Sequence, residues 1–215
     1  MAMGGLIPMR TDPMLTLNQW LSPAYPVGAF AYSHGLERLV ERGLKDVRPW
    51  LEDVLTHGSG TSDALFLAAA YHAETPEQTD AMCRAFAPSK ERLMELELQG
   101  AAFCEVTASA FNLPLEKLTY PVAIGWAAAL QGIPLPLTLQ IYLQAFVSNL
   151  VGAGQRLLPL GQREAQGIIA ALAPLISRIA QEVESGDLST LSGTAFLADI
   201  AAMQHEVQHS RIFRT

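Results

Sequence analysis

A long run of residues, 118–155, contains no Asp, Glu, Lys, Arg or His, and this run limits most strongly what the chain can fold into. Proline and glycine divide it into two helical pieces, at about 122–131 and 137–153. A helix that is apolar nearly all round is stable only when other helices or other chains cover it. We therefore expect this run to form the centre of a helical bundle and part of a subunit interface.

A membrane-spanning interpretation of the same run is weaker. The first piece is too short to cross a bilayer, and the second barely reaches the required length. The second piece also carries Gln140, Gln144 and Ser148 at four-residue spacing, a polar stripe that lipid would penalise. No cluster of Lys or Arg flanks either piece. We expect no membrane partner.

The rest of the sequence predicts an all-α protein. Strand signals are nearly absent, and Ala, Leu, Glu and Gln fill the segments between glycine and proline. The length of 215 residues suits one domain. We predict a single-domain helical bundle of about ten helices with a largely apolar central helix. It is organised as a flexible lead (1–13), an all-helical domain (14–209) and a C-terminal docking tail (210–215).

The helices expected before the charge-free run follow from the breaks at proline and glycine. In the longest of them Gly100 lies on the buried side, where it would let another helix approach closely. Two further helices are expected after the run, ending near 183 and 209. The earlier helices are expected at 14–21, 29–41, 47–57, 62–73, 76–86 and 89–111.

The amino-acid composition argues against several classes of function. The net charge is -7, which argues against broad binding to nucleic acid or to anionic membranes. Cys83 and Cys104 have no C-x-x-C spacing, so we expect two reduced thiols rather than a disulfide framework or a thiolate zinc site. The start of the sequence lacks the pattern of a secretory signal. We expect a cytoplasmic protein.

The segment 195–215 predicts a docking helix followed by a short basic and aromatic end. One helical face is continuously apolar, and its large side chains recur at helical spacing. The opposite face carries alanines and two histidines one turn apart. The residues of the apolar face are Phe196, Ile200, Met203 and Val207.

The same segment contains an H-E-x-x-H pattern, His205-Glu206-x-x-His209. In zinc peptidases two histidines at this spacing bind the metal and the glutamate activates water. No carboxylate, histidine or cysteine follows His209, so a third ligand would have to come from upstream. A zinc-dependent peptidase is therefore the alternative hypothesis. Our preferred interpretation has no catalytic residue and no metal site, and it places both histidines on a solvated or interface surface.

The segment 22–30 contains two prolines and a glycine, which fix a bent backbone of low entropy. Such a segment is either a rigid turn or a surface loop that presents Tyr25 and Phe30 to a partner. The residues alone leave both alternatives open.

Three separated stretches resemble the urease accessory protein UreF family. They are 22–37 (SPAYPVGAFAYSHGLE), 156–166 (RLLPLGQREAQ) and 199–214 (DIAAMQHEVQHSRIFR). Their order and spacing also fit, so the resemblance covers almost the whole chain. Two positions depart from the family pattern. The family usually has an aromatic residue where this chain has His209, which makes the zinc pattern look accidental, and tyrosine is common where this chain has Phe30.

The resemblance implies an all-helical, non-catalytic protein without a cofactor. Similar proteins pair with a second accessory protein (UreD, also called UreH), form homodimers and recruit the GTPase UreG. The complex acts on the urease apoprotein, so that nickel is inserted into its active site. The tail would then be ordered against the UreD/UreH-type partner, with Arg211 as a charged anchor and Phe213 as an apolar one. The expected partner-binding residues are Tyr25, Phe30, Tyr32, Glu37, His205, Glu206, Ser210, Arg211, Phe213 and Arg214.

Overall fold

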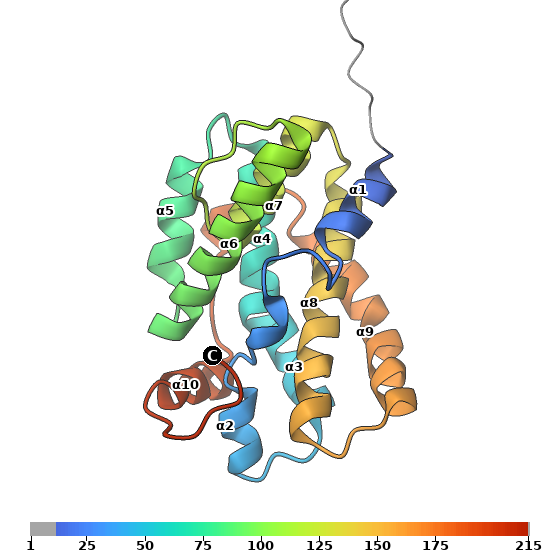
Figure 1. Ribbon diagram of the computed structural model, residues 1–215, viewed down its shortest axis with the longest axis vertical. Helices are drawn as coiled ribbons and strands as arrows, with labels where there is room; N and C mark the ends of the chain where they lie inside the picture. Colours follow the sequence, from blue (N-terminus) through green and yellow to red (C-terminus); the bar gives the residue numbers. More distant parts are fainter. Residues whose placement is uncertain (1–11, 215) are drawn as a thin grey trace, which may run out of the picture.

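The structure, a computed structural model, describes residues 12–214. Within this range the regular structure is helical, and the predicted all-α single domain is confirmed (Figure 1). The predicted flexible lead lies outside the described residues except for Asp12 and Pro13. The α-helices are α1 (Pro13–Trp20), α2 (Leu36–Glu41), α3 (Val47–His57), α4 (Ser59–His72), α5 (Glu77–Phe86), α6 (Lys90–Phe111), α7 (Tyr120–Gln131), α8 (Leu135–Leu157), α9 (Gln162–Glu182) and α10 (Phe196–His205). Two 3₁₀ turns, η1 (Ala29–Ala31) and η2 (Leu188–Thr190), complete the set.

Helix α4 lies in the middle of the bundle and packs against α3, α5, α7 and α8 (Figure 1). Its position follows from its composition, because nearly every residue from 62 to 70 is small or apolar and is buried. The charge-free run forms α7 and most of α8, and α7 buries most of its residues. None of the helices between residues 12 and 214 is both long enough and apolar enough to cross a membrane.

Two glycines allow backbone segments in the centre of the bundle to pack in direct contact with each other. A Cβ atom on Gly125 of α7 would lie 2.1 Å from the carbonyl oxygen of Leu67 on α4. A Cβ atom on Gly100 of α6 would lie 2.0 Å from the carbonyl oxygen of Leu118, just before α7. No side chain fits at either position without moving the backbone opposite. The prediction that Gly100 permits a close approach is confirmed.

The predicted helix 29–41 is wrong as one element. The structure has η1 and α2 instead, and the backbone between them turns through His34 and Gly35, both at positive φ (52° and 77°). Glycine adopts this conformation readily, whereas histidine does so only where surrounding contacts hold it. The turn directs the His34 side chain into the interior, where its Nε2 lies 3.0 Å from Oε1 of Glu95 on α6.

Candidate partner-docking site

Helix α10 turns its large apolar side chains outward. Four large apolar side chains of the helix, and a fifth just after its end, are between 49% and 82% exposed, whereas the opposite face of alanines is buried. Large exposed apolar side chains that gather on one helix are typical of protein contacts, so this face is a candidate docking surface. We call these residues the α10 apolar row: Phe196, Leu197, Ile200, Met203 and Val207.

The small side chains of α10 face inward because α10 lies directly against the start of α2 (Figure 1). A Cβ atom on Gly35 would lie 2.6 Å from the backbone nitrogen of Ala202 and 3.0 Å from the Cβ of Ala201. At this separation only glycine and alanine fit between the two backbones. The large apolar residues of α10 are therefore left on the outer side.

His205 is the last residue of α10 and is fully buried. Its Nδ1 lies 2.8 Å from Oε2 of Glu91 on α6, and its Nε2 lies 3.3 Å from Oε2 of Glu37 on α2. The expectation of a surface histidine is therefore wrong for His205. Because the inner face of α10 carries alanines, α10 packs closely against α2 and α6. The carboxylates of Glu37 and Glu91 therefore lie next to the His205 imidazole. His209 lies beyond the helix and is exposed.

The geometry does not favour the zinc peptidase. Helix α10 ends at His205, Glu206 caps it, and His209 is not on the same helical face, so the i, i+4 arrangement that the pattern requires is lost. The carboxylate of Glu206 accepts a hydrogen bond from the backbone nitrogen of Lys90 at 2.9 Å. Among residues 12–214 no group of three or more His, Cys, Asp and Glu side chains is placed to hold a metal ion.

The tail folds back onto its own chain through two carboxylates. Glu37 Oε1 accepts a hydrogen bond from the backbone nitrogen of Ile212 at 2.8 Å, and its Oε2 accepts one from the backbone nitrogen of Phe213 at 2.9 Å. Arg211 donates from Nη1 to Oε1 of Glu91 at 2.7 Å. The same two glutamates that hold His205 thus also hold the tail.

Phe213 anchors the tail inside the fold. Its side chain is 4% exposed, and the guanidinium carbon of Arg156 on α8 lies 4.1 Å from the centre of its ring. Arg156 also donates to the carbonyl oxygen of Phe30. The backbone nitrogen of Arg214 donates to the carbonyl oxygen of Ala31 at 2.8 Å. These contacts fix η1, α8 and the tail relative to one another.

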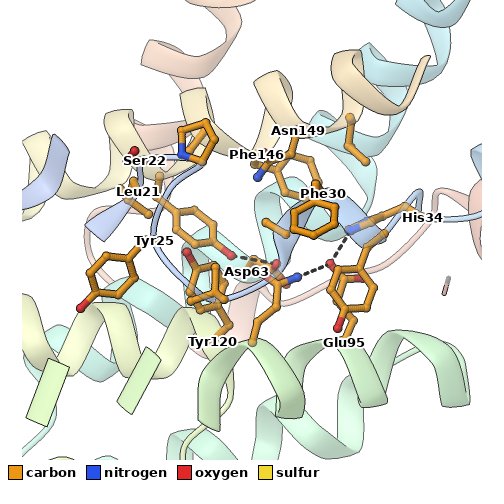
Figure 2. Close-up of a pocket in the computed structure, with 18 of the residues that line it drawn as sticks. Leu21, Ser22, Tyr25, Phe30, His34, Asp63, Glu95, Tyr120, Phe146 and Asn149 are labelled. Carbon is orange, nitrogen blue, oxygen red and sulfur yellow. Dashed lines mark hydrogen bonds and ion pairs between the residues drawn. The ribbon is translucent and has the colours of Figure 1, made fainter. Parts of the chain in front are cut away.

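A second cluster of charged side chains lies under the segment 21–30, at the base of a cleft (Figure 2). Arg92 pairs with Asp63 and, at 3.0 Å, with Oε2 of Glu95, while Tyr142 donates to Asp63 at 3.0 Å. Burial opposes ionisation of Glu95, but Arg92 and His34 outweigh it and lower the pKa of this carboxyl to about 2. Burial dominates at Asp63 and raises its pKa. The cluster ties α4, α6 and α8 together.

Comparison with known proteins decides the family. A model of the UreF family matches residues 42–173, more than half of the chain. The chain belongs to the UreF family. The urease accessory protein UreF of Roseobacter denitrificans is 51% identical over 213 residues, which cover 96% of each chain. That of Ruegeria pomeroyi is 53% identical over 209 residues, covering 94% of this chain and 96% of the relative. A Bradyrhizobium relative is 42% identical over 217 residues, covering 93% and 90%.

UreF proteins are urease accessory proteins rather than enzymes, so the predicted family and the predicted lack of enzymatic activity are both confirmed. The residues expected at partner surfaces fall into two groups in this UreF chain. The buried ones have little or no surface to offer in this arrangement; they are Tyr25, Tyr32, Glu37, His205 and Phe213. The accessible ones are Phe30, Glu206, Ser210, Arg211 and Arg214. Their roles toward partners stay predictions.

Tyr25 also has a defined internal partner. The Tyr25 hydroxyl lies 2.7 Å from Oγ1 of Thr107, and burial raises the pKa of both tyrosines, Tyr25 and Tyr32. Of the two interpretations of the segment 22–30, the structure thus gives a rigid turn at Tyr25 and an exposed side chain at Phe30. Sequence reasoning missed the exposed Ile212, although the apolar pair that it forms with Phe213, between Arg211 and Arg214, was a usable signal.

Proposed function

We propose that this UreF chain is a non-catalytic scaffold in urease maturation. It joins a UreD/UreH-type accessory protein and a UreG-type GTPase on the urease apoprotein, and thereby promotes nickel insertion into the urease active site. It acts in the cytoplasm as a homodimer. Family membership supports the link to urease, and one observation carries the scaffold role, namely the exposed α10 apolar row. A scaffold of this kind works by raising the effective concentration of its partners.

The α10 apolar row is assigned to the UreD/UreH-type partner. Covering apolar surface contributes about 25 cal/mol per Å², and five large side chains on one face supply a continuous area for it. The internal fold gains nothing from this area, because alanines and His205 make the contacts with α2 and α6. The basic tail next to the row supplies charged groups at its edge, which is the usual arrangement of an apolar centre and a polar rim.

The test is a co-expression pull-down with the UreD/UreH-type protein, with urease activation as a second measurement. The double variant Ile200→Asp/Met203→Asp places two carboxylates in the proposed contact. Burying an unpaired carboxylate costs several kcal/mol, so we expect partner affinity to fall by at least about a hundredfold. The control is Leu15→Asp, which changes a large apolar side chain that is 67% exposed, on α1 at the other end of the molecule (Figure 1).

Both variants should keep the wild-type helix content, because all three positions are exposed. If the double variant still captures the partner and supports urease activation like the control, the α10 apolar row is not the docking surface. Deletion of 210–215 is the companion test. It should abolish partner binding and leave the helix content unchanged.

A further inference from the structure

We propose that a cleft between α5 and α6 binds an organic cation, that is, an ammonium or guanidinium group carried on an apolar stem. Its volume is about 200 Å³, well above the about 10–15 Å³ that one water molecule needs. It shares Asp63 and Arg92 with the cleft under the segment 21–30, but its other lining residues differ. We call it the α5–α6 cleft, and the lining residues that decide its chemistry are Ser62, Asp63, Phe66, Phe86, Leu96 and Asp199.

Helix α4 supplies the polar floor of the α5–α6 cleft. Ser59, Ser62, Asp63 and Phe66 recur at i, i+3, i+4 and i+7, so they share one face of the helix. The hydroxyl of Ser59 is bonded to Nδ1 of His34 at 2.9 Å. Ser62 is only 8% exposed, and its hydroxyl forms no hydrogen bond within residues 12–214. A buried hydroxyl without a partner is costly, so Ser62 indicates a bound group that can form a hydrogen bond.

The charge around the α5–α6 cleft is negative. Among the described residues that line it, Arg92 is the one basic side chain, and it is already paired with Asp63 and Glu95. Asp199 of α10 is partly exposed and forms no ion pair within the range 12–214. Burial raises the pKa of Asp199, and the carboxylate of Asp53 on α3 raises it further. A cation beside Asp199 would relieve this repulsion, whereas an anion would add to it.

Apolar side chains form the walls of the α5–α6 cleft. Phe66 of α4 and Phe86 of α5 meet edge to face, with their ring centres 6.0 Å apart, and Leu96 of α6 faces the same space. Such walls cover an apolar stem, and aromatic rings also attract a cation. The ligand class that fits has its charge at one end, near Ser62 and Asp199, and carbon along the rest of its length.

This chemistry fits a free organic amine and a lysine or arginine side chain of another protein equally well. Because Asp199 belongs to α10, the α5–α6 cleft lies beside the helix that the proposed function assigns to the UreD/UreH-type partner. A partner side chain as the source of the cation therefore rests on the proposed function. Binding of a cation by the free chain does not.

The experiment titrates the free chain at pH 7 with three probes of similar size, namely benzylamine, benzyl alcohol and benzoate, and follows the backbone amide signals by NMR. Benzylamine should shift the signals of residues 59–66 and of Gly193, with a Kd of about 1 mM. Benzyl alcohol should bind about fivefold more weakly, because it lacks the charge that faces Asp199. Benzoate should not bind measurably.

Two variants test the named residues. In Asp199→Asn, benzylamine should bind as weakly as benzyl alcohol. The matched control is Asp46→Asn, which removes the same charge at an exposed residue that caps α3, a role that asparagine also fills. This control should bind benzylamine like the wild type. Ser62→Leu fills the α5–α6 cleft and should abolish binding of both probes; if it fails to fold, the partly exposed Asp199→Asn decides alone.

Absence of shifts at residues 59–66 and at Gly193 with about 20 mM benzylamine would overturn the site. Equal binding of all three probes, or wild-type binding of benzylamine by Asp199→Asn, would overturn its preference for cations.

The source of the cation follows from the affinity for the UreD/UreH-type protein with saturating benzylamine, compared with sodium chloride at the same ionic strength. An affinity at least fivefold lower assigns the cation to a side chain of the partner, and an unchanged affinity assigns it to a free amine. A wild-type chain that binds benzylamine but not the UreD/UreH-type protein would refute the proposed function and leave the cation site standing.

Discussion

Replacing Gly125 by alanine should destabilise the protein, although alanine is the better helix former. The added Cβ would lie 2.1 Å from the carbonyl oxygen of Leu67, more than 1 Å short of ordinary contact. The obstructing atom belongs to the backbone of α4, so it cannot rotate away, and α4 and α7 must separate. Overpacking a core costs about 1–3 kcal/mol and occasionally more, and removing a helical glycine returns about 0.5–1 kcal/mol. Because the obstructing atom is part of the backbone, we take the upper end of the overpacking cost, about 3 kcal/mol, and the expected net loss is then about 2 kcal/mol.

Gly167→Ala on α9 provides the control, because nothing lies within 4 Å of a Cβ at that position. The same substitution should stabilise there by about 0.5–1 kcal/mol. In a protein of this length each kcal/mol shifts the melting temperature by about 2–4 °C. Thermal unfolding followed by circular dichroism should therefore show a fall of about 4–8 °C for Gly125→Ala and a rise of a few degrees for Gly167→Ala. Two shifts of the same sign would refute the backbone contact between α4 and α7.

Two further predictions concern buried ionisable groups. Because the pKa of Glu95 is lowered to about 2, its ionised form stabilises the fold above the ordinary carboxyl range, and this contribution disappears as the pH falls from about 4.5 to 2. Urea unfolding at a series of pH values should give a shallower loss of stability over this window for Glu95→Gln than for the wild type; parallel curves would contradict the assignment. Burial, aided by Asp63, raises the pKa of Cys83 to about 12. A thiol reagent at pH 8 should therefore leave Cys83 unmodified in the native protein and modify it only after denaturation.

The sequence predicts the fold class and the close-approach points of this chain well, because these depend on local composition. The breaks at glycine, proline and turn residues gave α3, α6 and α7 at nearly their observed ends. Gly100 could be placed on a buried face from helical spacing alone. The break between η1 and α2 could not be predicted in this way. It depends on His34 at positive φ, a conformation that tertiary contacts with Glu95 impose.

The candidate site was harder to predict for a related reason. Helical periodicity identified the apolar face of α10 but did not say whether this face meets the core or the solvent. The answer depends on Gly35, which lies 160 residues and more before α10 and accepts only alanine opposite it. Likewise Glu37 and Glu91 have nothing in their sequence neighbourhood that links them to His205. Three-dimensional contacts alone bring these residues together.

Because the α10 apolar row faces outward, the two faces of this short helix tolerate substitutions for different reasons, one set by folding and the other by partner recognition. Substitutions on its alanine face are limited by the space next to α2, so folding itself selects against larger side chains there. Substitutions on its outer face leave the interior untouched and are selected only through recognition. A homologue could therefore acquire specificity for a different partner protein through a few substitutions on the outer face, while its thermal stability stayed the same.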